Sequence, residues 1–366
     1  MTPRTSAPAS DNQGQTQSLE ARVGQLFVVL LDPNRPPHQA VRWHGEHYFG
    51  GFFLRSENMP TIGQTRALSR LFRGYGRGFP PAMIAIDEEG GLVSHTSKIT
   101  TSAPSAMALG VVDDADVTGD VYEGIGTKLR SLGVNTVFAP VADIHSEPAN
   151  PVIGTRAFGT TARSVTKHAG AAIKGLRRAG VASTLKHFPG HGGTTQDSHF
   201  TLPTVDGSKD QLTDRELSPF ISLIEDEKPE LVMVGHVAYP GLDSSGKPAS
   251  LSRLILTDLL RTELDFNGLI ITDSLDMEAV KKDGPEVAVQ ALKAGCDLLL
   301  FGQDLEFAVQ CYQVVLEAFR SKKLSEERLV ESLERIHKLR DSFRARTWIR
   351  NEDAYDNLQI TEEALF

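Results

Sequence analysis

Short runs of apolar and β-branched residues recur along the chain, and most of them are continuous rather than alternating with polar residues. Continuous runs of this kind are typical of strands that are buried on both faces of a parallel sheet. We expect eight strands, which cover Gln25–Leu31, Gly51–Leu54, Met83–Ile86, Thr136–Ala139, Val181–Leu185, Leu231–Val234, Leu269–Thr272 and Cys296–Phe301.

Segments with helical periodicity separate most of these runs. One of them ends at Gly180, a residue suited to a helix C-cap, and its apolar face comprises Val165, Ala169, Ala172, Ile173 and Leu176. The alternation of strand and helix predicts a (β/α)8 TIM-type barrel of the α/β class in a single domain. An open doubly wound sheet is an alternative, although the sequence lacks the Gly-rich dinucleotide fingerprint that often follows its first strand. The other expected helices are Thr65–Phe72, Thr118–Leu132, Ser252–Leu264, Val287–Ala294 and Leu305–Phe319.

The composition changes at both ends of the chain. Residues 1–18 are rich in Ser, Thr, Pro and Gln, and we expect them to be disordered. The barrel and a closing helix over Ser325–Phe343 are expected to occupy residues 19–343. Residues 344–366 are mixed and polar, which predicts a C-terminal tail or a linker.

Composition and charge exclude several classes of protein. The chain has 366 residues, of which 40% are apolar and 23% are charged, as in an ordinary globular protein. The formal net charge of -9 argues against a nucleic-acid or anionic-membrane partner, because either would require a positive surface. We therefore expect a monomer that recognises a small, neutral molecule.

Segments for targeting, membrane insertion or disulfide bonding are not evident in the sequence. The N-terminal residues show no basic stretch followed by an apolar one, so we predict a cytoplasmic location. No apolar run approaches the roughly 18 residues that a membrane span requires. The two cysteines, Cys296 and Cys311, lie in apolar or helix-like segments and are expected to be buried thiols.

Polar residues follow five consecutive strands at the end where barrel enzymes gather their catalytic groups. A single polar residue at a strand end is unremarkable, because a solvated loop must begin there. Five strands in register indicate a site. The residues concerned are Asp87 with Glu88 and Glu89, then Asp143, Lys186 with His187, His236 and Asp273.

The loop from Lys186 to His199 combines one Lys, three His and one Asp with several glycines. A phosphate-binding loop does not fit, because Gly193 is followed by Thr rather than Lys. A zinc site and a solvated loop with stray histidines are alternatives, although the usual zinc-binding spacings and a nearby Cys are missing. The remaining interpretation is an acid/base pair, since Asp197 and His199 leave the same face of an extended backbone and the carboxylate can polarise the imidazole.

The stretch Lys186–Gly192, followed by Thr and then by Asp-Ser-His at 197–199, resembles the signature of glycoside hydrolase family 3 in its β-N-acetylglucosaminidase branch. That branch uses a His with a partner Asp on a mobile loop where most glycosidases use a carboxylic acid. Together the similar segments cover roughly residues 24–302. The further segments that resemble this family are Asp87–Gly91, Asn150–Gly159, Pro248–Ser252 and Thr272–Met277.

The resemblance implies a role for each candidate residue. Asp273 corresponds to the catalytic nucleophile, and His199 with Asp197 corresponds to the general acid/base dyad. Retaining cleavage requires such a carboxylate near the anomeric carbon and a proton donor on the leaving-group side. From the position of Asp273 we expect a rigid carboxylate close to a helix that begins near Ser274 and keeps it ionised. The residues that would bind hydroxyl groups of the sugar in subsite −1 are Asp87, Arg156, Lys186 and His187.

The function implied by the resemblance is a retaining exo-glycosidase. It would release β-linked N-acetylglucosamine from small soluble saccharides derived from chitin or peptidoglycan, through a covalent glycosyl-enzyme intermediate and without a metal or cofactor. The alternatives are a β-N-acetylglucosaminide phosphorylase or a β-glucosidase with the same residues, a metal-dependent hydrolase, and a sugar-binding barrel without turnover.

Three positions depart from the family pattern. Leu92 and His95 stand where the family often has two arginines, and Ser274 stands where an Asp is common after the nucleophile. These departures bear on the sugar specificity and on the support of Asp273. Gly190, Gly192 and Gly193 are expected to let the loop that carries His199 move.

Overall fold

A computed structural model describes residues 17–73 and 81–345 of the chain. The greater part of the expected disordered segment, residues 1–16, and residues 346–366 of the expected tail or linker lie outside the described residues. The described part begins with Ser18, whose hydroxyl accepts a hydrogen bond from Ala21 N and caps the first helix, α1 (Leu19–Gly24).

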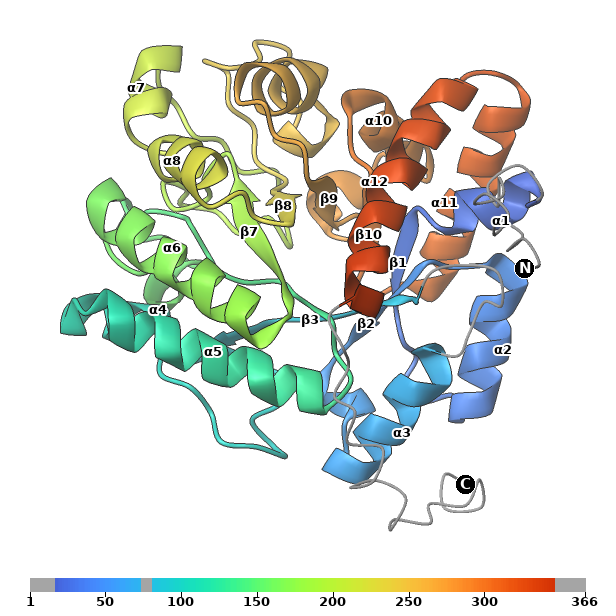
Figure 1. The fold of residues 1–366 in the computed structure, drawn as a ribbon. Helices are drawn as coiled ribbons and strands as arrows, with labels where there is room; N and C mark the ends of the chain where they lie inside the picture. The colour runs from blue at the N-terminus through green and yellow to red at the C-terminus, as the bar shows by residue number, and fades with distance from the viewer. Residues whose placement is uncertain (1–16, 74–80, 346–366) are drawn as a thin grey trace, which may run out of the picture.

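Eight parallel strands close into a barrel, and helices lie around them in Figure 1. The order of the strands around the barrel is β1-β10-β9-β8-β7-β6-β3-β2, and β2 pairs with β1 to complete the ring. All eight expected strands are confirmed, and so is the (β/α)8 TIM-type barrel. The barrel strands are β1 (Phe27–Leu30), β2 (Gly51–Leu54), β3 (Met83–Ile86), β6 (Thr136–Val137), β7 (Ala182–Phe188), β8 (Leu231–Val234), β9 (Leu269–Ser274) and β10 (Leu298–Phe301).

The strands lie inside a layer of helices, so their side chains are covered on both faces. Every residue of β1, β2, β3 and β8 is buried, which explains why the apolar runs do not alternate with polar residues. Outside the barrel, a short antiparallel hairpin is formed by β4 (Glu88–Gly90) and β5 (Val93–Ser94) directly after β3.

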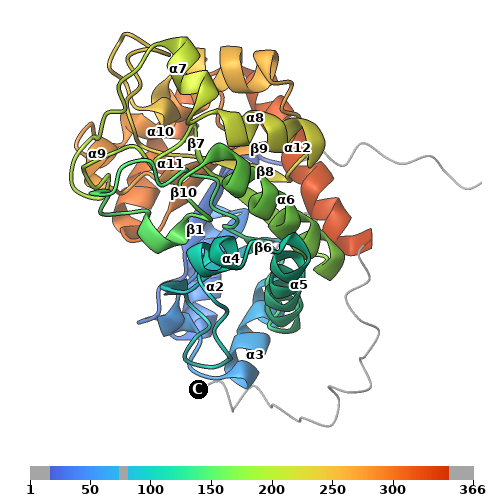
Figure 2. The same ribbon diagram turned by 90° about the vertical axis from the view of Figure 1, so that its left-hand side faces the viewer.

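Helices surround the barrel, and α5 and α6 lie side by side on one flank (Figures 1 and 2). The helices expected between the strands are present, and so is the closing helix, which is α12. The α-helices are α2 (Pro37–His47), α3 (Ile62–Arg73), α4 (Ala106–Val112), α5 (Ala115–Ser131), α6 (Ala162–Ala179), α7 (Lys209–Asp214), α8 (Ser218–Asp226), α9 (Glu278–Lys281), α10 (Glu286–Ala294), α11 (Leu305–Arg320) and α12 (Glu326–Ala345). Three short 3-10 helices are η1 (Ser56–Asn58), η2 (Gly154–Arg156) and η3 (Ala249–Leu251), and η4 (Leu254–Glu263) is a π-helix.

The helix expected to begin near Ser274 is not there, and that expectation was wrong. Strand β9 continues through Ser274, and α9 begins only at Glu278. The next residue, Leu275, still donates its backbone N–H to Leu300 O, so the chain stays paired with β10. This pairing between distant segments outweighs the local preference of the sequence.

The expectations about membrane-spanning segments and about the two cysteines can be compared with the structure. Within the described residues, no helix is both long and apolar enough to span a bilayer. Cys296 and Cys311 are buried free thiols, as expected.

Candidate active site

A cavity of about 290 Å³ lies at the carboxyl ends of the barrel strands. Residues from β2, β7, β8, β9 and β10, from the segment directly after β3 and from the loop after β7 line it. It brings together six of the seven predicted site residues, and the seventh, Asp197, hydrogen-bonds to one of them. The six are Asp87, Arg156, Lys186, His187, His199 and Asp273.

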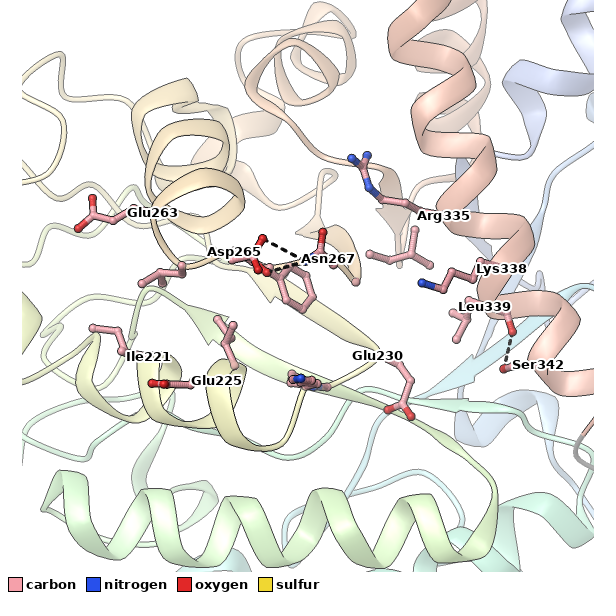
Figure 3. A pocket seen from close by; sticks show the side chains of 17 residues that line it. Ile221, Glu225, Glu230, Glu263, Asp265, Asn267, Arg335, Lys338, Leu339 and Ser342 are labelled. Carbon is pink, nitrogen blue, oxygen red and sulfur yellow. Dashed lines mark hydrogen bonds between the residues drawn. The ribbon is translucent and has the colours of Figure 1, made fainter.

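A larger cavity, of about 850 Å³, lies at the opposite end of the barrel beside the starts of β8 and β9. Figure 3 shows that α12 contributes Arg335, Lys338 and Leu339 to its wall. Active sites of (β/α)8 barrels form at the carboxyl ends of the strands rather than at this end. We therefore assign the chemistry to the smaller cavity.

Glu89 organises the charged wall of the site. Its carboxylate accepts two hydrogen bonds from Arg156, at 2.7 and 2.8 Å, and lies 2.6 Å from Lys186 Nζ. Burial alone would raise the pKa of Glu89, but the charges of Arg156 and Lys186 outweigh it and hold this pKa well below its usual range. Lys186 Nζ also donates to Asp87 Oδ1 at 2.6 Å, so two carboxylates and two cations form one network.

His187 is oriented by Asp143, a carboxylate that is fully buried. His187 Nδ1 lies 2.7 Å from Asp143 Oδ2, and the backbone N–H groups of His187 and His191 also donate to this carboxylate. The carboxylate only accepts, so Nδ1 carries the proton and Nε2, 3.4 Å from Arg156 Nη2, is the acceptor that faces the cavity side. Burial would raise the pKa of Asp143, but His187 and these hydrogen bonds lower it.

Asp273 lies at the end of β9 and lines the cavity. Burial would raise the pKa of Asp273, but His187, His236 and the backbone N–H of Ser274, which donates to Oδ1 at 2.7 Å, lower it to about 2. Asp273 is therefore ionised at neutral pH, as a nucleophile must be. The expected helix dipole does not supply this stabilisation, because no helix begins at Ser274.

His236 fixes the backbone that carries Asp273. Its Nε2 lies 2.9 Å from Ser274 O, and its Nδ1 lies 2.8 Å from Ser250 Oγ. A carbonyl oxygen only accepts, so Nε2 carries the proton, and the Ser250 hydroxyl donates to Nδ1. Burial lowers the pKa of His236, which keeps the ring neutral.

His199 and Asp197 form the predicted pair. One carboxylate oxygen, Asp197 Oδ1, lies 2.7 Å from His199 Nδ1 and accepts the backbone N–H of His199 at 2.8 Å. The expected extended backbone was wrong, because the N–H groups of Phe200 and Thr201 both donate to Asp197 O and close a turn. The Asp side chain folds back onto its own turn, which gives the same pairing by a different geometry.

The positions that depart from the family pattern differ in their effect on the cavity. Leu92 is 87% exposed and does not line the cavity, whereas His95 does, with Nδ1 3.2 Å from Ser56 Oγ. Burial lowers the pKa of His95. Ser274 donates its hydroxyl to Asp276 Oδ1 at 2.6 Å, and Asp276 in turn accepts backbone N–H groups after β10. The hydroxyl of Ser274 thus supports the neighbouring loop, while its backbone N–H binds the Asp273 carboxylate.

The histidines of the loop do not gather around one point. His187 and His191 are hydrogen-bonded through their ring nitrogens to different partners, and His199 pairs with Asp197. Within residues 17–73 and 81–345, no three His, Cys, Asp or Glu side chains are placed to hold one metal ion.

A (β/α)8 barrel that gathers an ionised strand-end carboxylate, a His-Asp pair and a charged wall in one cavity is compatible with a glycoside hydrolase. Over residues 18–339 the chain matches the family described as "Glycosyl hydrolase family 3 N terminal domain". The chain belongs to glycosyl hydrolase family 3, and the resemblance found in its sequence is confirmed.

Relatives and solved structures agree with this assignment. The chain is 35% identical to "Beta-hexosaminidase A" of Pseudoalteromonas piscicida over 80% of its length, and it spans only 53% of that relative. It is 36% identical to a "Beta-hexosaminidase" of Idiomarina loihiensis, covering 73% of this chain and 81% of the relative. The structure of a family 3 β-N-acetylglucosaminidase from Paenibacillus sp. str. FPU-7 matches with a TM-score of 0.85 and 36% identity, over 90% of this chain and 63% of that one.

Proposed function

We propose that this chain is the catalytic barrel of a retaining, exo-acting β-N-acetylhexosaminidase. It would release β-linked N-acetylglucosamine from small saccharides derived from chitin or peptidoglycan, as a monomer whose domain spans residues 19–343. The observation that carries the proposal is that Asp273 and His199 line the same small cavity. The names of the relatives support N-acetylglucosamine as the sugar.

The charged wall suits a neutral sugar that is rich in hydroxyl groups. The ammonium group of Lys186 has three N–H donors, of which two point to Asp87 and Glu89, so one is left for a sugar oxygen. The second oxygen of Asp87 would accept a hydrogen bond from a sugar hydroxyl group, and His187 Nε2 would accept one in place of its long, 3.4 Å contact with Arg156. Since the cations and carboxylates compensate each other, the wall can bind hydroxyls without requiring an ionic substrate.

In the first step, the Asp273 carboxylate attacks the anomeric carbon while protonated His199 donates its Nε2 proton to the oxygen of the leaving group. The bond between the anomeric carbon and that oxygen breaks, and a glycosyl ester of Asp273 forms. Asp197 stabilises the imidazolium before this transfer, because its carboxylate lies against Nδ1. In the second step, the now neutral His199 accepts a proton from water, which attacks the anomeric carbon and releases Asp273.

The size of the cavity supports exo-cleavage. A volume of about 290 Å³ is at the lower limit for small-molecule sites and accommodates one sugar ring with its substituents. The aglycone therefore lies outside it, on the side where His199, half exposed, reaches the leaving-group oxygen.

A screen of aryl β-glycosides tests the proposal. We expect kcat/KM for the N-acetylglucosaminide to exceed those for the glucoside and xyloside at least about tenfold, with the β-anomer as the first product. A sugar 1-phosphate as main product in phosphate buffer would instead indicate a phosphorylase. Binding without release above the buffer rate would indicate a sugar-binding barrel.

A further inference from the structure

His191 occupies an unusual place in the loop after β7. Its side chain is buried, and its two ring nitrogens face two hydroxyl groups of the same loop, Thr194 Oγ1 and Ser198 Oγ, each at 3.0 Å. The backbone N–H of His191 donates to Asp143 Oδ1 at 2.6 Å. The ring therefore bridges the fixed root of the loop and its distal part.

Ser198 stands between the two members of the proposed dyad. Its side chain is 2% exposed, whereas those of Asp197 and His199 are 27% and 49% exposed. Within the described part of the chain, two hydrogen bonds join residues 197–201 to groups outside that turn. One is the Ser198–His191 contact, and the other is a longer one, 3.4 Å, from Glu278 N to His199 O.

On the basis of the proposed function, we infer that His191 and Ser198 are positioning residues for the dyad. Their hydrogen bond ties the turn that carries His199 to Asp143. The same Asp143 carboxylate holds the His187 ring, which faces the sugar. One buried carboxylate thus sets the place of both the sugar-binding histidine and the proton donor.

The tether works with a neutral imidazole. Burial lowers the pKa of His191, so the ring has one N–H donor and one lone pair at neutral pH. A hydroxyl group both donates and accepts, so Thr194 and Ser198 satisfy the two nitrogens in either tautomer. The tether therefore adds no charge beside Asp273.

Loss of the tether has a specific kinetic consequence. The turn would be free to leave its place above the cavity, which impairs proton donation but leaves Asp273 in position. Departure of a poor leaving group requires the acid, whereas a dinitrophenolate leaves without it. The effect therefore depends on the leaving group, which a general loss of structure would not produce.

The test compares methyl and 2,4-dinitrophenyl β-N-acetylglucosaminides with the variant Ser198→Ala. We expect kcat/KM for the methyl glycoside to fall about tenfold, the effect of one lost orienting hydrogen bond, and that for the dinitrophenyl glycoside to stay within about twofold. Thr201→Ala is the control, because its exposed hydroxyl lies on the same turn without reaching His191. His191→Gln, which keeps an N–H donor toward Ser198, should retain more activity on the methyl glycoside than His191→Ala.

Equal losses on both substrates, or no loss on either, would overturn the tether. Thermal unfolding of each variant shows whether it is folded. If Ser198→Ala does not fold, His191→Gln takes its place in the comparison of the two substrates. The variant His199→Ala separates this inference from the proposed function. The proposed function itself fails if the activity loss of His199→Ala does not depend on the leaving group, or if the wild type cleaves neither substrate. If the loss in His199→Ala depends on the leaving group and the loss in Ser198→Ala does not, only the tether is wrong.

Discussion

Glu89 is a buried carboxylate that holds both cations of the charged wall. Arg156 binds it through two hydrogen bonds and Lys186 through one, and all three side chains are mostly buried. Removal of one partner from such a network leaves uncompensated charge in a site of low dielectric constant. Glu89 therefore supports the positions of Arg156 and Lys186, although it need not contact the sugar itself.

The variant Glu89→Gln should unfold more easily and cleave more slowly. We expect a loss of about 3–5 kcal/mol in the free energy of unfolding, since Arg156 and Lys186 lose a shared countercharge, and a fall of roughly a hundredfold in kcat/KM. Urea unfolding and steady-state kinetics measure the two effects. The control Glu46→Gln removes an exposed ion pair with Arg42 and should change neither. A Glu89→Gln variant with the stability and activity of the wild type would contradict this role.

The separation of partners along the chain decided which site residues could be predicted. Asp197 and His199 lie two positions apart, so their pairing could be predicted from spacing. Glu89 and Arg156 are 67 positions apart, and Asp143 and His187 are 44 positions apart, so only the folded barrel joins them. Asp143 stands among the polar strand ends, but nothing in the sequence assigns it a role.

At the scale of elements, the loop after β7 packs closely against the segment after β6, although its glycines predict a mobile loop. A Cβ atom on Gly192 would lie 1.7 Å from the carbonyl oxygen of Ile144, which no real contact allows. The sequence predicts that this glycine gives mobility. In the structure it lets the loop lie directly on the segment after β6, and that contact places the loop that carries His199.

The substitution Gly192→Ala should displace this loop. The added methyl group meets backbone rather than a flexible side chain, so we expect kcat/KM to fall at least about tenfold, together with a lower midpoint of thermal unfolding. Gly124→Ala is the matched control, because a Cβ there on α5 meets no atom within 4 Å and alanine favours helix. Unchanged kinetics of Gly192→Ala would show that the close contact is not required.

The strands were predictable and one helix boundary was not. Continuous apolar runs identified all eight strands, because burial on both faces leaves no other residue types at those positions. The end of β9 could not be placed, since its extension depends on Leu300 and His236, which contact Leu275 and Ser274 from other parts of the chain. The six-residue helix α7 contains too few turns for a clear period and was not expected, and neither was α8.

At the scale of the whole molecule, one buried histidine links stability to pH. His44 lies among Phe49, Phe52 and Phe72, and neither of its ring nitrogens has a hydrogen-bond partner within the described residues. Burial, followed by the charge of His47, lowers the pKa of His44 to about 3. The folded protein therefore keeps His44 neutral under conditions in which the unfolded chain protonates it.

Stability should fall as the pH decreases below the ordinary histidine value of about 6.5. Between that value and about 3 the unfolded state binds one more proton, and this contributes a loss of about 2 kcal/mol from pH 7 to pH 5. Urea unfolding at pH 7 and pH 5 gives the difference in the free energy of unfolding between the two pH values. This difference should be smaller by about 2 kcal/mol in His44→Phe than in the wild type. The same difference in both proteins would show that His44 is not the group responsible.

The central claim is that Asp273 forms a covalent bond with the sugar. The most direct measurement is mass spectrometry of peptides after incubation with a fluorinated N-acetylglucosaminide that forms the intermediate faster than it hydrolyses. We predict a glycosyl adduct on the peptide that contains Asp273, and neither adduct nor turnover in Asp273→Ala. An adduct on another residue, or turnover that persists in Asp273→Ala, would contradict the account.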